Sequence, residues 1–178
     1  MKKIIYLGIF LSLVTSVCAV ALATVSQITT PIIQAAQEEA FLAAVERSFP
    51  TATHSEVLAT ADEDDVVQVL AIFEDEEPLG FFYTKVIPGV WGPILYLVGI
   101  DMNGVFTSFD VLDHSETPGI GDVIERPEWI DRVVGASLMY PVDAISGATG
   151  TTALVSNALY DMYEHFSVLR DNGGITNE

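Results

Sequence analysis

The segment Asp143-Ala-Ile-Ser-Gly-Ala-Thr149 is the part of the sequence most suited to chemistry, because it comes just before a helical pattern. The first turn of a helix has backbone N–H groups without partners and carries the positive end of the helix dipole, so it attracts anions. Gly147 and Ala148 are small enough for a phosphate to approach the backbone, and Thr149 adds a hydroxyl to which it can be esterified. The segment therefore suggests a phosphate-binding turn, although Ser and Thr also cap helices that bind nothing.

A second segment, His114 to Gly121, combines a tight turn with a histidine and a glutamate. The Pro118-Gly119 pair is typical of a turn that follows a strand. A His-x-Glu pair also occurs in metal sites, but no third or fourth ligand stands nearby, so we predict no metal here. The sequence contains no catalytic triad, P-loop or dinucleotide fingerprint, and we predict no catalytic residue.

Both segments resemble the FMN-binding domain family. Asp143 to Thr149 matches the family signature Asp-x-x-Ser/Thr-Gly-Ala-Thr/Ser at every fixed position. His114 to Gly121 matches His-x-Glu-Thr-Pro-Gly-Leu-Gly except at Ile120, and Gly89 to Ile94, followed by Gly99-Ile100-Asp101, is similar to the central hairpin of the family. The resemblance extends over essentially the whole chain and is strongest to the G subunit of Rnf electron-transport complexes. The C subunit of the sodium-pumping NADH:quinone oxidoreductase shares both motifs but is usually longer.

The resemblance implies a flavoprotein that carries electrons within a membrane-bound, ion-translocating oxidoreductase, with no substrate turnover of its own. FMN would be attached to Thr149 through a phosphoester made by a dedicated flavin transferase, and other membrane subunits of the complex would be partners. Asp143 would orient the turn or help the transferase to recognise it. The further residues expected around the cofactor are Ser146, Gly147, Ala148 and Gly150 at the phosphate, and Glu116, Thr117 and Gly119 at the ring or the ribityl chain.

Two other functions fit the same residues. The first is a free-standing extracytoplasmic flavoprotein, which has the same fold and the same Thr149 but needs no integral membrane partner. The second is a binding or structural module without flavin, in which the Ser-Gly-Ala-Thr turn only caps a helix. Co-purification with membrane subunits distinguishes the first function from the complex subunit, and the absorbance of denatured protein distinguishes the second.

The composition limits the classes of function. With 178 residues, of which 50% are hydrophobic, the chain can form one packed domain and still have an N-terminal membrane segment. The net charge of −18, from 25 acidic and 7 basic residues, excludes a nucleic-acid-binding surface, because phosphate backbones require clustered Lys and Arg. Cys18 is the only cysteine, so neither an internal disulfide nor a cysteine-ligated iron–sulfur cluster can form.

The N-terminus has the pattern of a membrane anchor. Lys2 and Lys3 precede an apolar run from Ile4 to Val25, which is long enough to cross a bilayer as a helix. We predict an anchor over residues 1–28 and an FMN-binding domain over residues 29–178. Because lysines stay on the cytoplasmic side, the domain is expected outside the cytoplasm, with the chain crossing the cell (inner) membrane once. Cleavage after Ala21-Leu22-Ala23, as in a signal peptide, is the alternative.

The rest of the chain predicts an α+β fold, an antiparallel sheet with packed helices. A helix is expected from Pro31, capped by Thr30, to Pro50, and a loop from Thr51 to Asp65. Strands are expected over residues 66–73, 79–86, 95–100 and 105–112, in two hairpins turned by residues 74–77 and 101–104. Helices are expected over residues 128–134 and 151–170, the second ended by residues 171–174.

Overall fold

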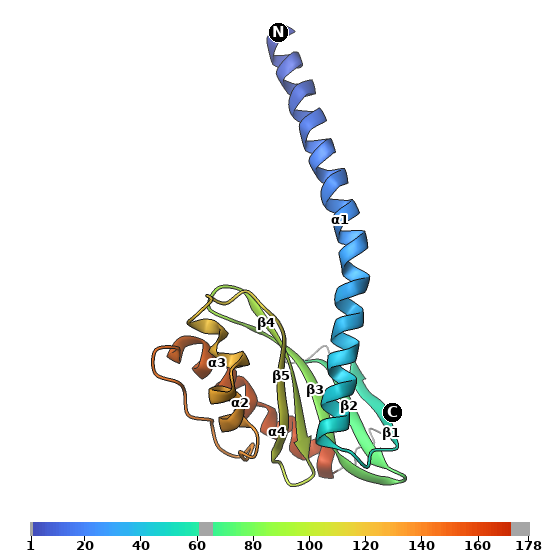
Figure 1. The fold of residues 1–178 in the computed structure, drawn as a ribbon, viewed down its shortest axis with the longest axis vertical. Coiled ribbons are helices and arrows are strands. Elements are labelled where there is room, and N and C mark those ends of the chain that lie inside the picture. The colour runs from blue at the N-terminus through green and yellow to red at the C-terminus, as the bar shows by residue number, and fades with distance from the viewer. Residues whose placement is uncertain (1, 61–65, 172–178) are drawn as a thin grey trace. The chain divides into compact units, whose positions relative to one another are not determined.

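The computed structural model describes residues 2–60 and 66–171 (Figure 1). Its contacts divide the chain into two compact units, Met1–Ala40 and Phe41–Glu178. The first unit is helical throughout its described part, and the second is an antiparallel sheet with helices. The predicted α+β class is therefore confirmed. Of residues 171–174, which were expected to end the last helix, only Asp171 lies within the described range.

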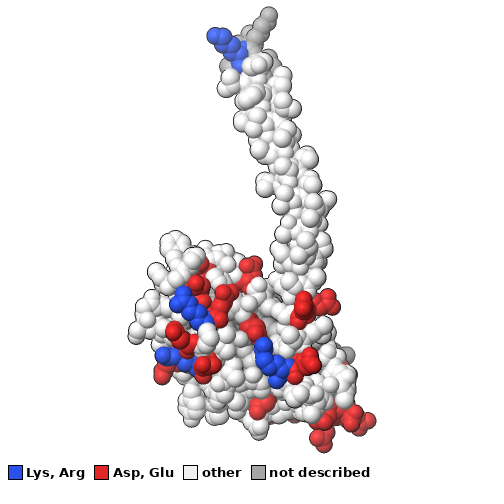
Figure 2. Space-filling model, in the orientation of Figure 1, with Lys and Arg blue, Asp and Glu red and all other residues white. Residues whose placement is uncertain are grey.

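Helix α1 (Lys2–Ser48) contains the predicted membrane segment. Its stretch Tyr6–Ser48 has a mean hydropathy of 2.2 over its most apolar window, and it is the one helix among the described residues that is long and apolar enough to cross a membrane. Figure 2 shows the helix without charged side chains over most of its length, in agreement with the uncharged sequence between Lys3 and Glu38. Hydroxyls within it, such as that of Thr24, donate to the carbonyl four residues earlier, which satisfies them without water.

The predicted helix start at Thr30-Pro31 is wrong, because α1 runs through both residues without a break. Proline lacks an N–H, so it removes the helical hydrogen bond to the carbonyl of Gln27. The flanking residues keep helical geometry nonetheless, since a single missing bond does not have to end a helix. The pattern that is typical of a first turn occurs here in a helix interior.

The sheet has five antiparallel strands in the order β1-β2-β3-β4-β5, so that each strand pairs with its neighbour in sequence. Four of them match the predicted strands, and the fifth, β1, was expected to be loop. It pairs with β2 from His54 opposite Phe73 to Thr60 opposite Gln68. The strands are β1 (His54–Thr60), β2 (Val66–Glu74), β3 (Glu77–Pro88), β4 (Pro93–Asp101) and β5 (Phe106–His114).

Both predicted hairpin turns are present. Asp75 has a φ of +56° between β2 and β3, and Gly104 has a φ of +77° between β4 and β5. The Asp101 carboxylate accepts hydrogen bonds from the backbone N–H groups of Asn103 and Val105, each at 2.9 Å. This carboxylate therefore fixes the second turn by local hydrogen bonds.

The two faces of the sheet are buried in different cores, because side chains alternate along each strand. Phe81 and Tyr83 point into the larger core, whereas Phe82 between them points into the smaller one. Helices α2, α3 and α4 contribute Trp129, Val155 and Phe166 to the larger core, among others, and the last turns of α1 contribute Ala44 to the smaller. A central sheet covered on both faces explains why its strands are nearly continuous hydrophobic runs.

Four short helices follow the sheet: η1 (Gly121–Glu125), α2 (Pro127–Val133), α3 (Thr149–Tyr160) and α4 (Met162–Asp171). The first of these was not predicted, and the second agrees with the expected helix over residues 128–134. The expected helix over residues 151–170 is divided at Asp161 into α3 and α4. The buried spacing of Val155, Leu159, Met162 and Phe166 continues across this division, so both helices turn the same apolar stripe to the sheet.

Candidate functional site

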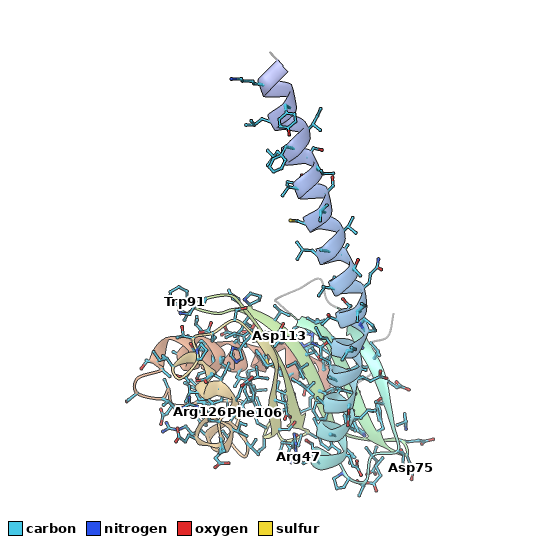
Figure 3. All side chains as sticks on the ribbon, turned by 45° about the horizontal axis from the view of Figure 1, so that its top comes forward. Arg47, Asp75, Trp91, Phe106, Asp113 and Arg126 are labelled. Carbon is cyan, nitrogen blue, oxygen red and sulfur yellow. The ribbon has the colours of Figure 1, made fainter. Side chains whose placement is uncertain are left out.

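A cavity of about 140 Å³ lies where three segments meet. These are the tip of the β3–β4 hairpin, the loop after β5 and the start of α3. Figure 3 shows Trp91 at the hairpin tip, where 72% of its surface is exposed. The cavity is lined by Val90 and Trp91 of the hairpin, by Glu116, Thr117, Ile120 and Gly121 of the loop, and by Gly147, Ala148, Gly150 and Thr151 at the helix start.

The turn before α3 leaves the start of that helix open. Gly147 has a φ of +91°, which glycine adopts without strain, and the Ala148 N–H closes the turn by donating to Ile145 O at 3.1 Å. Ala148 is the N-cap, and its side chain makes no capping hydrogen bond in the described part of the chain. The first N–H groups of α3 therefore have no side-chain cap, and a helix start of this kind can bind an anion.

Thr149 is the first residue of α3, is exposed, and stands in the chain between the lining residues Ala148 and Gly150. Its hydroxyl donates to Ile145 O over 3.3 Å, a long hydrogen bond. Thr152, by contrast, is fully buried, donates to Ala148 O at 2.9 Å and accepts from the Ile145 N–H at 3.1 Å. Of these two hydroxyls, only that of Thr149 can be reached from solvent.

Glu116 lies in the cavity wall with only 5% of its surface exposed. One carboxylate oxygen accepts from the Trp91 N–H at 3.1 Å, and the other accepts from the Thr151 hydroxyl at 2.6 Å. A charged group loses much solvation when it is buried, and hydrogen bonds of this kind compensate for that loss. Glu116 thus connects the hairpin tip with the start of α3.

His114 supports the same loop. Its Nδ1 accepts from the Glu116 N–H at 3.0 Å, which requires the neutral ring to carry its proton on Nε2, and this atom lies 3.2 Å from Glu125 Oε1. No group of three or more His, Cys, Asp or Glu residues that could hold a metal ion occurs within residues 2–60 and 66–171. Both ring nitrogens of His114 are therefore engaged in hydrogen bonds or ion pairs within the fold.

The loop is closed by a second carboxylate. Thr117 O accepts from the Gly121 N–H at 2.8 Å, and Gly119 between them has a φ of +82°. The Gly119 N–H also donates to the Asp122 carboxylate and is the main reason why the pKa of Asp122 lies below its ordinary value, with Arg126 adding to the effect. The Pro-Gly turn expected from the sequence is thus held by its own backbone and by Asp122.

The structure brings together five of the nine residues expected at the cofactor. Glu116, Thr117, Gly147, Ala148 and Gly150 line one cavity although the loop and the helix start are far apart in sequence. Three others, Asp143, Ser146 and Thr149, are exposed on the adjoining turn, and the Asp143 carbonyl accepts from Arg132. Gly119 shapes the loop but is not among the lining residues.

The sequence prediction omitted five lining residues: Val90, Trp91, Ile120, Gly121 and Thr151. A signal was available for the first two, because the Gly89 to Ile94 segment resembles the family hairpin and contains a tryptophan in a turn. Thr151 gave no such signal, since a threonine in a helical pattern is ordinary.

Comparisons with known proteins agree with this geometry. Residues 89–164, which include all three cavity-forming segments, match the FMN-binding domain. The G subunit of the ion-translocating oxidoreductase complex from Cereibacter sphaeroides is 29% identical over 174 residues, covering 86% of this chain and 80% of that protein. The protein of the same name from Methanosarcina acetivorans is 28% identical and covers 93% of this chain and 96% of that one.

Among solved structures, NqrC from Shewanella oneidensis has a similar fold. The TM-score is 0.52 with 23% sequence identity, over 72% of this chain and 74% of that one. This likeness supports the α+β architecture described above.

Proposed function

We propose that this chain, whose residues 89–164 match the FMN-binding domain, is an electron-carrying subunit of an Rnf-type, membrane-bound ion-translocating oxidoreductase. In this proposal FMN is held covalently, by a phosphoester to Thr149. The observation that carries the proposal is the exposed Thr149 at the uncapped start of α3, between Ala148 and Gly150, which both line the cavity.

The residues around Thr149 suit a phosphate. The N–H groups of the first turn of α3 and its dipole stabilise negative charge, and Gly147 and Gly150 have no side chain to obstruct it. Ser146, exposed on the same turn, adds a further hydroxyl. Asp143 is exposed at the beginning of the turn, where it orients the segment or contributes to recognition by the flavin transferase that makes the ester.

The rim of the cavity suits an aromatic ring that remains accessible. Val90, Trp91 and Ile120 are each more than half exposed and form an apolar rim. A volume of about 140 Å³ is below the roughly 300–1,000 Å³ of pockets that enclose a small ligand. This chain would therefore hold FMN at its surface. Bound FMN supplies electron transfer in single or paired steps, and an exposed position leaves it open to redox partners.

The N-terminal helix attaches this domain to the membrane in our proposal, with residues 1–28 as the anchor and residues 29–178 as the domain. Lys2 and Lys3 would keep the N-terminus in the cytoplasm, so that the domain and its flavin lie outside it. The partners are then the other membrane subunits of the complex. A reporter fused after Glu178 should be active outside the cytoplasm, and activity in the cytoplasm would contradict this orientation.

The test of the function is a purification of the full chain from membranes of cells that also produce its flavin transferase and the membrane subunits of the complex. We expect flavin absorbance that stays with the chain through denaturation and washing, together with co-purifying membrane subunits. Flavin that washes away would contradict the ester, and retained flavin without any membrane subunit would favour the free-standing flavoprotein. A colourless chain would favour a module without flavin.

A further inference from the structure

The surroundings of Glu116 leave room for its side chain and for little else. A Cβ atom added to Gly89 would overlap Glu116 Oε1, and one added to Gly121 would lie 2.7 Å from both its Cβ and its Oε2. Contacts below 3.0 Å are not tolerated without a shift of the chain. Two segments therefore approach the carboxylate as closely as glycine permits, and both oxygens are already hydrogen-bonded.

The threonines at the start of α3 differ in what holds their hydroxyls. That of Thr151 donates to Glu116 at 2.6 Å and the residue is 4% exposed, whereas Thr149, two positions earlier, is exposed and only weakly bonded. In the absence of Glu116, the Thr151 hydroxyl would lose the acceptor that holds it inward. Glu116 therefore links the first turn of α3 to the hairpin tip through two hydrogen bonds.

We propose that Glu116 is a positioning residue for flavin attachment, an inference that rests on the proposed function. Through Thr151 and the Trp91 N–H, it holds the first turn of α3 against the hairpin tip and presents Thr149, instead of Thr151, as the acceptor. Glu116 takes no part in the bond changes. The Thr149 Oγ–P bond forms as a P–O bond of a flavin dinucleotide donor breaks, and the hydroxyl proton leaves with the departing mononucleotide.

The charge of Glu116 is also consistent with an indirect role. A carboxylate in contact with a phosphate would repel it, particularly in a buried site. Thr151, in the first turn of α3, uses the carboxylate as an acceptor. The role assigned to Glu116 therefore requires only its two hydrogen bonds, and a neutral side chain that retains them should replace it.

Two matched pairs of variants separate positioning from other roles. Glu116→Gln keeps both contacts, because its carbonyl accepts from the Trp91 N–H and its amide donates to the Thr151 hydroxyl, which can also accept. Glu116→Ala removes both contacts. Thr151→Ser keeps the hydroxyl, and Thr151→Val removes it while preserving the shape of the side chain.

The experiment follows attachment of FMN to the full chain in detergent, with purified flavin transferase and FAD, by intact mass and peptide mapping. We expect Glu116→Ala and Thr151→Val to slow attachment at least tenfold, and Glu116→Gln and Thr151→Ser to stay within about threefold of wild type. The double variant Glu116→Ala/Thr151→Val should be no slower than the slower single variant, because both remove one interaction. In Glu116→Ala, modification of Thr151 would support its role in selecting Thr149.

Wild-type attachment rates in Glu116→Ala, or equal rates in Thr151→Val and Thr151→Ser, would overturn the inference. The second comparison decides the matter if Glu116→Ala does not fold. A slow Glu116→Gln would also overturn it, since the charge would then be required. The proposed function has a separate control: if Thr149→Val is still modified at the wild-type rate, the acceptor itself is misassigned, whatever the Glu116 variants do.

Discussion

One face of the sheet is covered by α2, α3 and α4, and the other is covered by the end of α1. The helices on the first face also carry the segments that form the cavity. The Glu116 loop leads into η1, and the turn before Thr149 leads into α3. The core on the second face consists of only a few buried residues around Phe82. Packing on the first face thus positions the site, whereas packing on the second joins the sheet to the helix that continues toward the N-terminus.

We therefore expect changes in the two cores to affect stability and site geometry differently. Damage to the larger core should affect both the free energy of unfolding and flavin attachment. Damage to the smaller core should lower the free energy of unfolding and leave attachment intact in molecules that remain folded.

The largest effect is expected from Trp129→Ala on the larger face. Trp129 is fully buried beside Phe109, and its loss should lower the free energy of unfolding by about 4–5 kcal/mol. Trp129→Phe should lose less than half as much, because the indole N–H has no hydrogen-bond partner in the described structure. Urea unfolding of the full chain in detergent, followed by circular dichroism, measures both. If both variants lost the same free energy of unfolding, the indole N–H would contribute more to stability than the volume of the ring.

A smaller effect is expected from Phe82→Ala on the opposite face. The ring packs edge-on against Phe41 and Phe49, with centroids 5.8 and 5.7 Å away, so its removal should lower the free energy of unfolding by about 3 kcal/mol. The rate of flavin attachment, measured well below the unfolding temperature, should stay at the wild-type value. A slow Phe82→Ala variant that is still folded would mean that the two faces are not separable.

Next in size is Gly121→Ala at the cavity. The new Cβ would overlap Glu116, and relief of that overlap should cost about 1–3 kcal/mol and slow flavin attachment. Gly150→Ala is the matched control, because its Cβ would meet only Val90 at 3.4 Å and alanine favours the helix. The control should be as stable as wild type or slightly more so in the same unfolding assay. If Gly150→Ala were less stable than Gly121→Ala, the packing described around Glu116 would be contradicted.

The smallest effect concerns Asp122, which closes the loop beside the cavity. The Gly119 N–H lowers the pKa of its carboxyl below the ordinary value of 3.8, so the ionised form stabilises the fold above that pH. This contribution is lost as the pH falls through the lowered pKa. Asp122→Asn should therefore be less stable than wild type at pH 7, and the difference should shrink below about pH 3.8. Thermal unfolding of both proteins at pH 7 and below about pH 3.8 tests this prediction. A stability difference between them that grows in acid would contradict it.

Much of the fold was predictable from local patterns. The four strands from β2 to β5 show strong hydrophobic runs, and their turns have residues that accept positive φ, such as Gly104. Strand β1 was missed because its sequence has no strong strand pattern. It lies at the edge of the sheet, and its extended conformation is stabilised by pairing with β2. Pro31 was misread as a helix start because a local signal does not reveal whether the chain before it is already helical.

The site was predictable only in part. The turn around Thr149 and the loop around Glu116 were found as motifs, because their resemblance to a family does not depend on knowing the fold. Thr151 was missed, and so was the contact of Trp91 with Glu116, since both depend on hydrogen bonds between segments distant in sequence. Long-range hydrogen bonds of this kind leave no periodic trace in the sequence.

The measurement that tests the central proposal most directly is the intact mass of two Thr149 variants, each co-expressed with the flavin transferase. Thr149→Ser retains a hydroxyl at the start of α3 and should gain the mass of one FMN less one water, as wild type should. Thr149→Val has the same shape without a hydroxyl and should have the mass of the bare chain. Thr149→Val protein that still carries the added mass would contradict the assignment of Thr149 as the residue that holds the flavin.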